Sequence, residues 1–445
     1  MDYLFIPFFK FVIGYIFSVW WILLPFLVWF IVKEKHLITA RYTYRGKLKW
    51  IFLEIKIPPY VKKSPKAMEE IFYSLHAVFR KGDPWARFIQ GFTPPFYVFE
   101  MIGHNGKLRF IIRCLESYKD FVASRIYSQY PEASVELVED PLKDLPWKIP
   151  NPTFDVIGCE FIFTKLEDDK KTPKDYYPIK TYEVWEKLPE EQRIDPISIL
   201  SEGITYLSNK EWIIIQIMAM PVPGSDKEFG REWASRGKKE VDKLMGRKEK
   251  KEPSPFDYIF EFIKNFFLAL AGQKIEWKVG KEEEKKEAEK DLMKLTPGER
   301  EIIEGIERKI SKPGYWCVVR FCYVAAKDVF SKNRDKNVGL VMGTFKVFDR
   351  QDMNGLIRDP KTIPSIDRPI TYFKSLYDEK VFYRKRLIWA YTKGRWNTDY
   401  DENRIVLNTE ELASLYHIPS EVVPSYGLEI TPTRYIPPSP EVPEV

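Results

Sequence analysis

Residues 96–113 read FYVFEMIGHNGKLRFIIR and contain a clear secondary-structure signal. Two runs rich in apolar residues, 96–102 and 107–113, flank the pair Asn105-Gly106. Asn-Gly tolerates the positive φ angles of tight hairpin turns, and apolar runs on both sides of it are typical of paired strands. The stretch therefore predicts two antiparallel strands joined by a short turn.

The sequence on either side of this hairpin predicts a complete β-α-β-β-α-β unit. Residues 50–57 alternate between apolar and charged side chains, as a half-buried strand does. Ser64 and Pro65 then favour the start of a helix whose apolar residues share one face. A second helix and a short strand that begins near Val135 complete the order, which is that of the ferredoxin-like fold.

A second copy of the same order is predicted further along the chain. It begins with a strand at 156–164, continues with a helix at 197–207 and includes the very apolar strand 212–220. The pattern resumes at 315–324, after an interruption at 225–312. We therefore expect an α+β fold with two ferredoxin-like units, the second of which is interrupted by a helical insertion.

The insertion contains one strongly apolar helix candidate, residues 256–271, which follows the basic run 248–251. This helix is too short to span a membrane. Three placements remain open for it: the membrane surface, the surface of a partner protein and this protein's own core. The residues of its apolar face are Phe256, Ile259, Phe260, Ile263, Phe267 and Leu270.

A long apolar segment precedes this body. Residues 11–32 read FVIGYIFSVWWILLPFLVWFIV and carry no charged side chain, and at about 1.5 Å per residue a helix of this length crosses a hydrocarbon layer of about 30 Å. Basic residues are scarce before the segment and frequent directly after it, over 33–49. By the positive-inside rule, the sequence predicts a single-pass protein of the cell membrane, with its N-terminus outside and its body in the cytoplasm.

These signals divide the chain into consecutive parts. The expected parts are a transmembrane anchor at 1–36, a first ferredoxin-like unit at 37–145, the two portions of a second unit at 146–224 and 313–360, the helical insertion at 225–312, a basic helical segment at 361–432 and a proline-rich tail at 433–445. The tail is expected to be flexible because its composition does not favour a packed structure.

The composition is that of a folded chain, and the chain contains no recognisable catalytic motif. Aromatic residues make up 16% of it, far too many for a disordered protein. The histidines and cysteines do not have the spacing of a zinc site, and no Gly-Lys pair continues with the Ser or Thr of a phosphate-binding loop. The sequence therefore predicts no enzyme, no cofactor and no metal site.

A basic segment with interspersed aromatic residues lies near the C-terminus, at 383–395. Basic side chains pair with phosphates and aromatic rings stack on bases, so the segment suits nucleic acid bound without sequence preference, or anionic lipid. An ordinary solvated helix explains it equally well, and the net charge of +6 permits such partners without requiring them. The candidate contact residues are Arg384, Lys385, Arg386, Trp389 and Arg395.

Three segments carry a resemblance to a known family: EIKIPPYVKKSPKAMEEIFYSLH at 54–76, LTPGEREIIEGIERKISKPGYW at 295–316 and LNTEELASLYHIP at 407–419. With the apolar N-terminal segment, they make the chain similar to the membrane-proximal N-terminal region of conjugative type IV coupling-protein-like DNA-transfer ATPases. The chain also resembles stand-alone relatives of that region that lack the motor domain. We therefore expect no motor activity.

The resemblance implies a non-enzymatic, membrane-anchored scaffold or docking component of a type IV secretion or conjugative DNA-translocation apparatus, which serves a separate motor ATPase. The expected partners are the lipid bilayer, a P-loop ATPase or other secretion-system subunits, and further copies of this chain in a homo-oligomer. The alternative is a membrane-tethered nucleic-acid-binding protein that uses the helix at 383–395. A membrane enzyme is a third interpretation, and no motif supports it.

Overall fold

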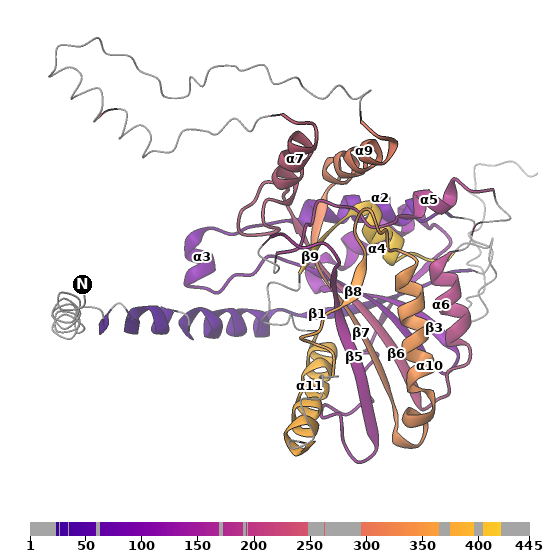
Figure 1. Cartoon of the computed structure of the whole chain (residues 1–445). Helices are drawn as coiled ribbons and strands as arrows, with labels where there is room; N and C mark the ends of the chain where they lie inside the picture. Colours follow the sequence, from indigo (N-terminus) through magenta and orange to yellow (C-terminus); the bar gives the residue numbers. More distant parts are fainter. Residues whose placement is uncertain are drawn as a thin grey trace, which may run out of the picture.

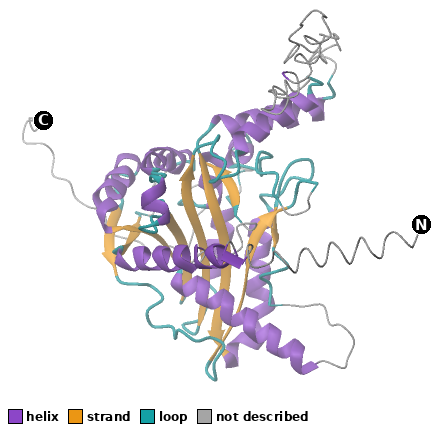
Figure 2. Ribbon diagram, turned by 90° about the vertical axis from the view of Figure 1, so that its left-hand side faces the viewer, coloured by secondary structure: helices purple, strands orange, loops and turns teal. Residues whose placement is uncertain are grey.

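The computed structural model describes residues 24–25, 27–33, 35–58, 63–168, 172–189, 193, 195–247, 262, 295–364, 374–395 and 404–419. Within these residues the strands form one nine-stranded sheet, and helices lie on both sides of it (Figure 1). Figure 2 shows the strands at the centre of the molecule with helices around them.

The first half of the body contains the predicted hairpin. Asn105 and Gly106 have φ angles of 50° and 73°, and they join β2 to β3 in an antiparallel pair. In chain order the elements are β1 (Trp50–Lys56), α2 (Lys66–Leu75), a 3-10 helix (His76–Val78), α3 (Pro84–Phe88), β2 (Tyr97–His104), β3 (Lys107–Leu115), a 3-10 helix (Glu116–Tyr118), α4 (Lys119–Gln129) and β4 (Ser134–Val138).

The second half begins its helices with strong N-terminal signals. Asp195 caps α6 by accepting from the Ile197 amide, and Thr296 and Glu299 form a capping box at the start of α9. The elements are β5 (Phe154–Phe163), α5 (Tyr182–Glu186), α6 (Pro196–Ile204), β6 (Glu211–Val222), α7 (Trp233–Leu244), α9 (Pro297–Ser311), β7 (Gly314–Ala326), α10 (Lys327–Lys346), β8 (Leu356–Arg358), α11 (Lys374–Gly394), β9 (Ile405–Asn408) and α12 (Thr409–Leu415).

All strand pairs in this sheet are antiparallel, in the order β4-β1-β3-β2-β6-β7-β5-β8, and β9 pairs with β7 beside the end of β5. The two longest strands, β6 and β7, lie next to each other at the centre. They remain paired from Glu211 opposite Ala325 to Val222 opposite Gly314. The middle of the sheet therefore has a fixed register over its full length.

The fold is α+β, but the prediction of a transmembrane helix followed by two ferredoxin-like units, the second of them interrupted, is wrong. The strand orders β4-β1-β3-β2 and β8-β5-β7-β6 do repeat, which explains the repeated sequence pattern. However, β2 pairs with β6 along its whole length, from Tyr97 to His104, and the two sets of strands form one sheet. An unpaired edge strand exposes its N–H and C=O groups, and the pairing of β2 with β6 satisfies both edges at once.

The N-terminal helix also differs from the predicted transmembrane helix. Residues 27–33 and 35–47 are helical, but in the part of the chain that the structure describes, no helix is long and apolar enough to cross a membrane. Charged residues recur from Lys33 onward and interrupt the apolar run. Residues 11–23 of the predicted span lie outside the described residues.

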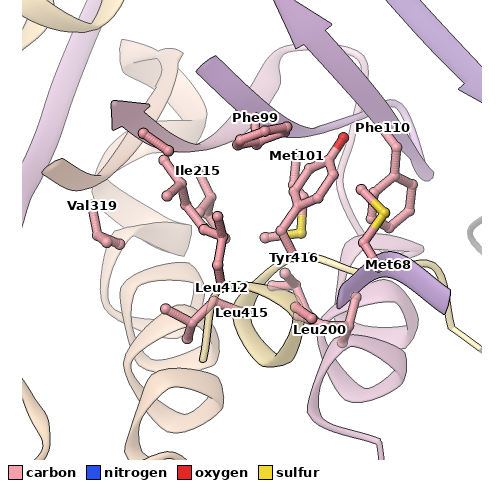
Figure 3. Close-up of a cluster of buried hydrophobic side chains, with 14 of the residues drawn as sticks. Met68, Phe99, Met101, Phe110, Leu200, Ile215, Val319, Leu412, Leu415 and Tyr416 are labelled. Carbon is pink, nitrogen blue, oxygen red and sulfur yellow. The ribbon is translucent and has the colours of Figure 1, made fainter. Parts of the chain in front are cut away.

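One face of the sheet, which we call the helix-covered face, packs against several helices and forms the main hydrophobic core. Because successive strand residues point to opposite faces, alternate residues of β2, β6 and β7 meet α2, α6, α10 and α12 there. Tyr416, directly after α12, lies at the centre of this core, with its ring 5.3 Å from that of Phe99 and 5.6 Å from that of Phe110 (Figure 3). The end of the described chain is therefore part of the core.

The helical insertion is described only in part. Its helices α7 and α9 stand together at one end of the body (Figures 1 and 2), where Val241 and Ile306 pack with Tyr176. The predicted amphipathic helix at 256–271 lies outside the described residues except for Phe262. Its candidate contact residues Phe256, Ile259, Phe260, Ile263, Phe267 and Leu270 are all outside them.

Candidate functional site

The second face of the sheet carries a row of buried polar side chains, which we call the polar row. Glu100, Gln216, Arg320 and Glu160 lie at directly opposed positions on β2, β6, β7 and β5, and each is fully buried. Gln216 donates to Glu100 over 2.8 Å, and Arg320 donates to Glu160 over 2.6 Å. Burial of an unpaired charge is costly, so the folded state depends on these pairings.

The end of α11 closes one side of the polar row. Arg395 is buried and donates to Glu100 and to Asp140, each over 2.7 Å. Burial raises the pKa of Asp140, but the hydrogen bonds and the charge of Arg395 outweigh it and hold that pKa below its usual value. Burial lowers the pKa of Arg395, but the carboxylates of Glu100 and Asp140 outweigh it and raise that pKa. Arg395 and Asp140 are therefore a charged, mutually bound pair at neutral pH.

Two further residues predicted to contact nucleic acid or anionic lipid, Lys385 and Trp389, also meet partners inside the protein. The Lys385 ammonium lies 2.8 Å from both carboxylate oxygens of Asp155. Trp389 is fully buried, and its indole N–H donates to the carbonyl oxygen of Pro146 over 2.9 Å. These two side chains fasten α11 to β5 and to the loop that precedes it.

The remaining two candidates, Arg384 and Arg386, differ from each other. Arg384 donates to the carbonyl oxygen of Ile363 over 2.9 Å and is half-buried. Arg386 is exposed, and its guanidinium lies 6.0 Å from the ring centre of Phe382. The structure thus uses most of this basic and aromatic segment for internal contacts.

The three segments that carry the family resemblance meet in one place, which we call the motif junction. Lys312, from the second segment, donates to Glu69 of the first over 2.6 Å and to Glu410 of the third over 2.8 Å. Burial lowers the pKa of Lys312, but Glu410 and Glu69 outweigh it and raise that pKa. Residues far apart in the sequence are therefore joined by one bridging cation.

A second set of contacts holds the third segment in the motif junction. Asn408 and Glu411 form a capping box at the start of α12. The carboxylate of Glu411 also accepts from Lys309 over 2.9 Å and from the Ile179 amide over 2.9 Å, and Lys309 and Glu411 are both buried. Burial raises the pKa of Glu411. This arrangement positions β9 and α12.

A cavity of about 160 Å³ lies on the second face of the sheet, beyond the polar row; we call it the arginine pocket. Its cationic lining comes from Arg41 and Arg45 of the N-terminal helix, Arg87 of α3 and Arg404 directly before β9. The remaining lining residues are Phe92, Thr93, Pro94, Phe96, Met218, Met220, Glu228, Phe229, Trp316 and Val318. The pocket therefore combines a mostly apolar floor with several positive charges.

Two arginines of this pocket, Arg87 and Arg404, are held by contacts within the protein. Arg87 forms an ion pair with Glu228, and its guanidinium lies 5.7 Å from the ring centre of Phe229. The guanidinium of Arg404 lies 4.4 Å from the ring centre of Trp316, as in a cation–π contact. Glu228 is the one carboxylate among the described residues that line the pocket.

The N-terminal helix reaches the pocket through a close contact at Gly91. A Cβ atom at Gly91 would lie 2.2 Å from a backbone atom of Ala40, and the φ angle of Gly91 is +72°. Both features require glycine, because any side chain would collide with the helix and strain the backbone. Next to this contact, Tyr44 packs against Phe92 with ring centres 5.5 Å apart. The helix is thus fixed against the loop between α3 and β2.

The same helix and α3 also present an exposed apolar surface, which we call the apolar patch: Trp29, Trp85, Phe88 and Ile89. These side chains are 63%, 66%, 42% and 48% exposed. The Lys33 ammonium lies 5.3 Å from the ring centre of Trp29 and 5.6 Å from that of Phe88, and so connects the two elements. Figure 1 shows the N-terminal helix and α3 on the same side of the body.

Sequence reasoning missed the arginine pocket. Its four arginines lie at positions 41, 45, 87 and 404, so no local spacing connects them. Only the i, i+4 spacing of Arg41 and Arg45 on one helix face is visible in the sequence. Elsewhere, the described residues contain no group of three or more His, Cys, Asp or Glu side chains placed to hold a metal ion.

The comparisons with known proteins concern the sheet and its helices. A search of curated proteins gave no significant match, and a search of solved structures gave none either. One family model, described as "Domain of unknown function (DUF8128)", matches residues 49–425. The match begins where β1 begins and covers more than half of the 445 residues. The chain therefore belongs to the family described as domain of unknown function DUF8128.

Proposed function

We propose that this chain is a non-enzymatic scaffold that works at a membrane surface. In this proposal it is a docking component of a type IV secretion or conjugative DNA-translocation apparatus and serves a separate motor ATPase. One observation supports the proposed membrane location, namely the apolar patch on the N-terminal helix and α3. The proposed role in the apparatus rests on the sequence resemblance of the three segments that meet at the motif junction.

The apolar patch is larger than the scattered apolar residues of an ordinary protein surface. Exposed side chains continue from it along the helix, at Leu27, Val28, Phe30, Ile31 and Val32, each between 46% and 58% exposed. Soluble proteins rarely expose contiguous apolar surface of this extent, and where they do it marks a binding site or a membrane contact. A partner is therefore needed to cover this surface.

The composition of the patch favours lipid as that partner. Tryptophan and other aromatic side chains are enriched where a protein meets the boundary between headgroups and acyl chains, and lysine extends its ammonium toward the headgroups. Trp29, Trp85 and Phe88 around Lys33 have this combination. In the proposal, the patch rests in the membrane surface and the sheet stands above it.

The membrane part is tested with a polarity-sensitive dye attached to a cysteine at position 85. The four native cysteines are buried, and burial raises the pKa of Cys114 and Cys322 to about 12, so a Trp85→Cys variant of the full chain is labelled selectively. With phosphatidylcholine vesicles, we expect the emission of the dye to shift to shorter wavelength. The shift reports entry of this site into an apolar layer, however the rest of the chain is held.

The matched control is Trp147→Cys, because Trp147 is as exposed as Trp85, at 66%, and lies outside the patch. We expect no shift from a dye at position 147. If the protein floats with vesicles but the dye at 85 keeps the emission it has in water, the patch does not meet lipid. If the protein does not float with vesicles at all, the membrane location itself is wrong.

The apparatus part is tested by crosslinking in cells that make the protein, followed by purification in mild detergent and mass spectrometry. We expect a P-loop ATPase of the coupling-protein class, or another secretion-system subunit, to be crosslinked to this chain. An unrelated tagged membrane protein from the same cells is the control. Recovery of neither class of protein would contradict a docking role and would leave the membrane part unaffected.

A further inference from the structure

The arginine pocket lies on the same two elements as the apolar patch. Arg41 and Arg45 are on the helix that carries Trp29, and Arg87 is in α3 between Trp85 and Phe88. A molecule that lies against the patch therefore has the pocket within reach of one of its ends. A phospholipid has this combination of an apolar body and a charged group.

The chemistry of the pocket suits a phosphate. A guanidinium has five N–H donors in a planar fork that matches phosphate oxygens, so an arginine that already meets one partner inside the protein keeps donors for a ligand. The cavity of about 160 Å³ is far larger than the roughly 10–15 Å³ that one water molecule requires. Its floor of Met218, Val318 and Trp316 excludes water from one side, which strengthens charge interactions there.

We propose that the arginine pocket binds the phosphate group of an anionic phospholipid whose acyl chains lie along the apolar patch. This inference rests on the proposed membrane function and adds lipid selectivity to it. In the complex, the phosphate accepts hydrogen bonds from the guanidinium groups of Arg41, Arg45 and Arg404, and Arg87 stays paired with Glu228. The lipid thereby joins the N-terminal helix, α3 and the start of β9.

The test measures thermal unfolding of the full chain in an uncharged detergent to which lipid is added. We expect phosphatidylglycerol and phosphatidic acid to raise the midpoint, because a ligand that binds only the folded state stabilises it. Phosphatidylcholine, which carries a compensating positive charge, has a much smaller effect. The Arg45→Gln Arg404→Gln double variant weakens the apparent affinity for phosphatidylglycerol about tenfold or more.

The charge-matched control is Lys380→Gln with Arg386→Gln, which removes two exposed positive charges from α11. It keeps the affinity of the unmodified protein. An equal loss in this control, or an equal response to phosphatidylcholine, would show general charge attraction and overturn the pocket. The exposed Arg41→Gln variant, which disturbs the interior least, is a second test if the double variant unfolds.

Soluble phosphate compounds distinguish a lipid headgroup from a free phosphate. Inorganic phosphate and glycerol phosphate should raise the midpoint only at far higher concentrations than the lipid does. If they act at the same concentrations, the ligand is a soluble phosphate ester and the lipid part of the inference is wrong. The dye at position 85 tests membrane contact with neutral vesicles, and the unfolding midpoint tests phosphate binding. The membrane proposal and the pocket proposal can therefore fail independently of each other.

Discussion

The two faces of the sheet differ in the middle of the central strands: the helix-covered face carries apolar side chains there, whereas the second face carries the polar row between apolar clusters. Val319 and Phe321 of β7 point to the helix-covered face, where they join the main core with other apolar residues. Arg320, between them, points to the second face and belongs to the polar row. All three are at most 1% exposed, so the two faces differ in chemistry and not in depth.

This contrast shows that the two faces respond differently to sequence change. A core of apolar side chains depends mainly on volume, and it tolerates substitutions that keep that volume. A buried charge depends on one particular partner, and removal of that partner leaves an uncompensated charge. Residues on the helix-covered face can therefore be replaced by others of similar volume without loss of the fold. The polar row on the second face depends on contacts that only particular residues can make.

The largest effect is expected from Arg320→Ala. This change removes the guanidinium that pairs with the buried carboxylate of Glu160, and the carbonyl oxygen of Tyr391 loses a donor at 2.9 Å. We expect the free energy of unfolding to fall by about 3–5 kcal/mol. Urea unfolding of the full chain, followed by circular dichroism, measures it.

Two further variants test whether the cost comes from the lost ion pair. Arg320→Met with Glu160→Leu removes both charges and keeps the volume, so it should recover most of the loss, though not the part that belongs to Tyr391. Val319→Ala, one residue away on the other face, should cost only about 1.5–3 kcal/mol. A double variant that is as unstable as Arg320→Ala would mean that lost packing, and not the loss of the ion pair with Glu160, explains the effect.

Local signals in the sequence predicted the local structure well. The Asn105-Gly106 turn and the capping box of Thr296 and Glu299 were both identified from residues within three positions of each other, and both are present. The helix predicted after Ser64 is also present, as α2. These features depend on neighbouring residues, so the sequence contains all the information they require.

Contacts between distant segments could not be read in the same way. The pairing of β2 with β6 joins Tyr97 to Ala219, and neither strand shows in its own pattern which neighbour it will have. Arg395 looks like a surface residue of a basic helix because its partners Glu100 and Asp140 are far away in the sequence. Both the single sheet and the arginine pocket therefore required the structure.

A smaller effect on stability is expected from an ion pair that lies on the helix-covered face. His417, two residues after α12, is buried, and its Nε2 atom lies 3.0 Å from the carboxylate of Asp195 at the start of α6. Burial lowers the pKa of His417, but Asp195 outweighs it and raises that pKa above its ordinary value. Burial raises the pKa of Asp195, but His417 outweighs it and lowers that pKa. The two groups therefore form an ion pair over a limited range of pH.

The direction of the pH dependence follows from these two shifts. The contribution of His417 is complete below its unfolded pKa of about 6.5 and is lost as the pH rises through its higher folded pKa. The contribution of Asp195 is present above its unfolded pKa of about 3.9 and is lost as the pH falls through its lower folded pKa. His417→Gln should thus lower the free energy of unfolding by about 1.5–3 kcal/mol near pH 5.5, and by less at pH 9.

Urea unfolding of the unmodified protein and of His417→Gln at both pH values measures this difference. Leu415→Ala, which removes only apolar contacts at the last residue of α12, is the control, and its cost should be equal at pH 5.5 and pH 9. An equal cost of His417→Gln at both pH values would mean that His417 acts as a neutral hydrogen-bonding residue. Packing and neutral hydrogen bonds would then hold the helix-covered face at this point. The contrast with the buried charges of the polar row would be stronger than the ion pair suggests.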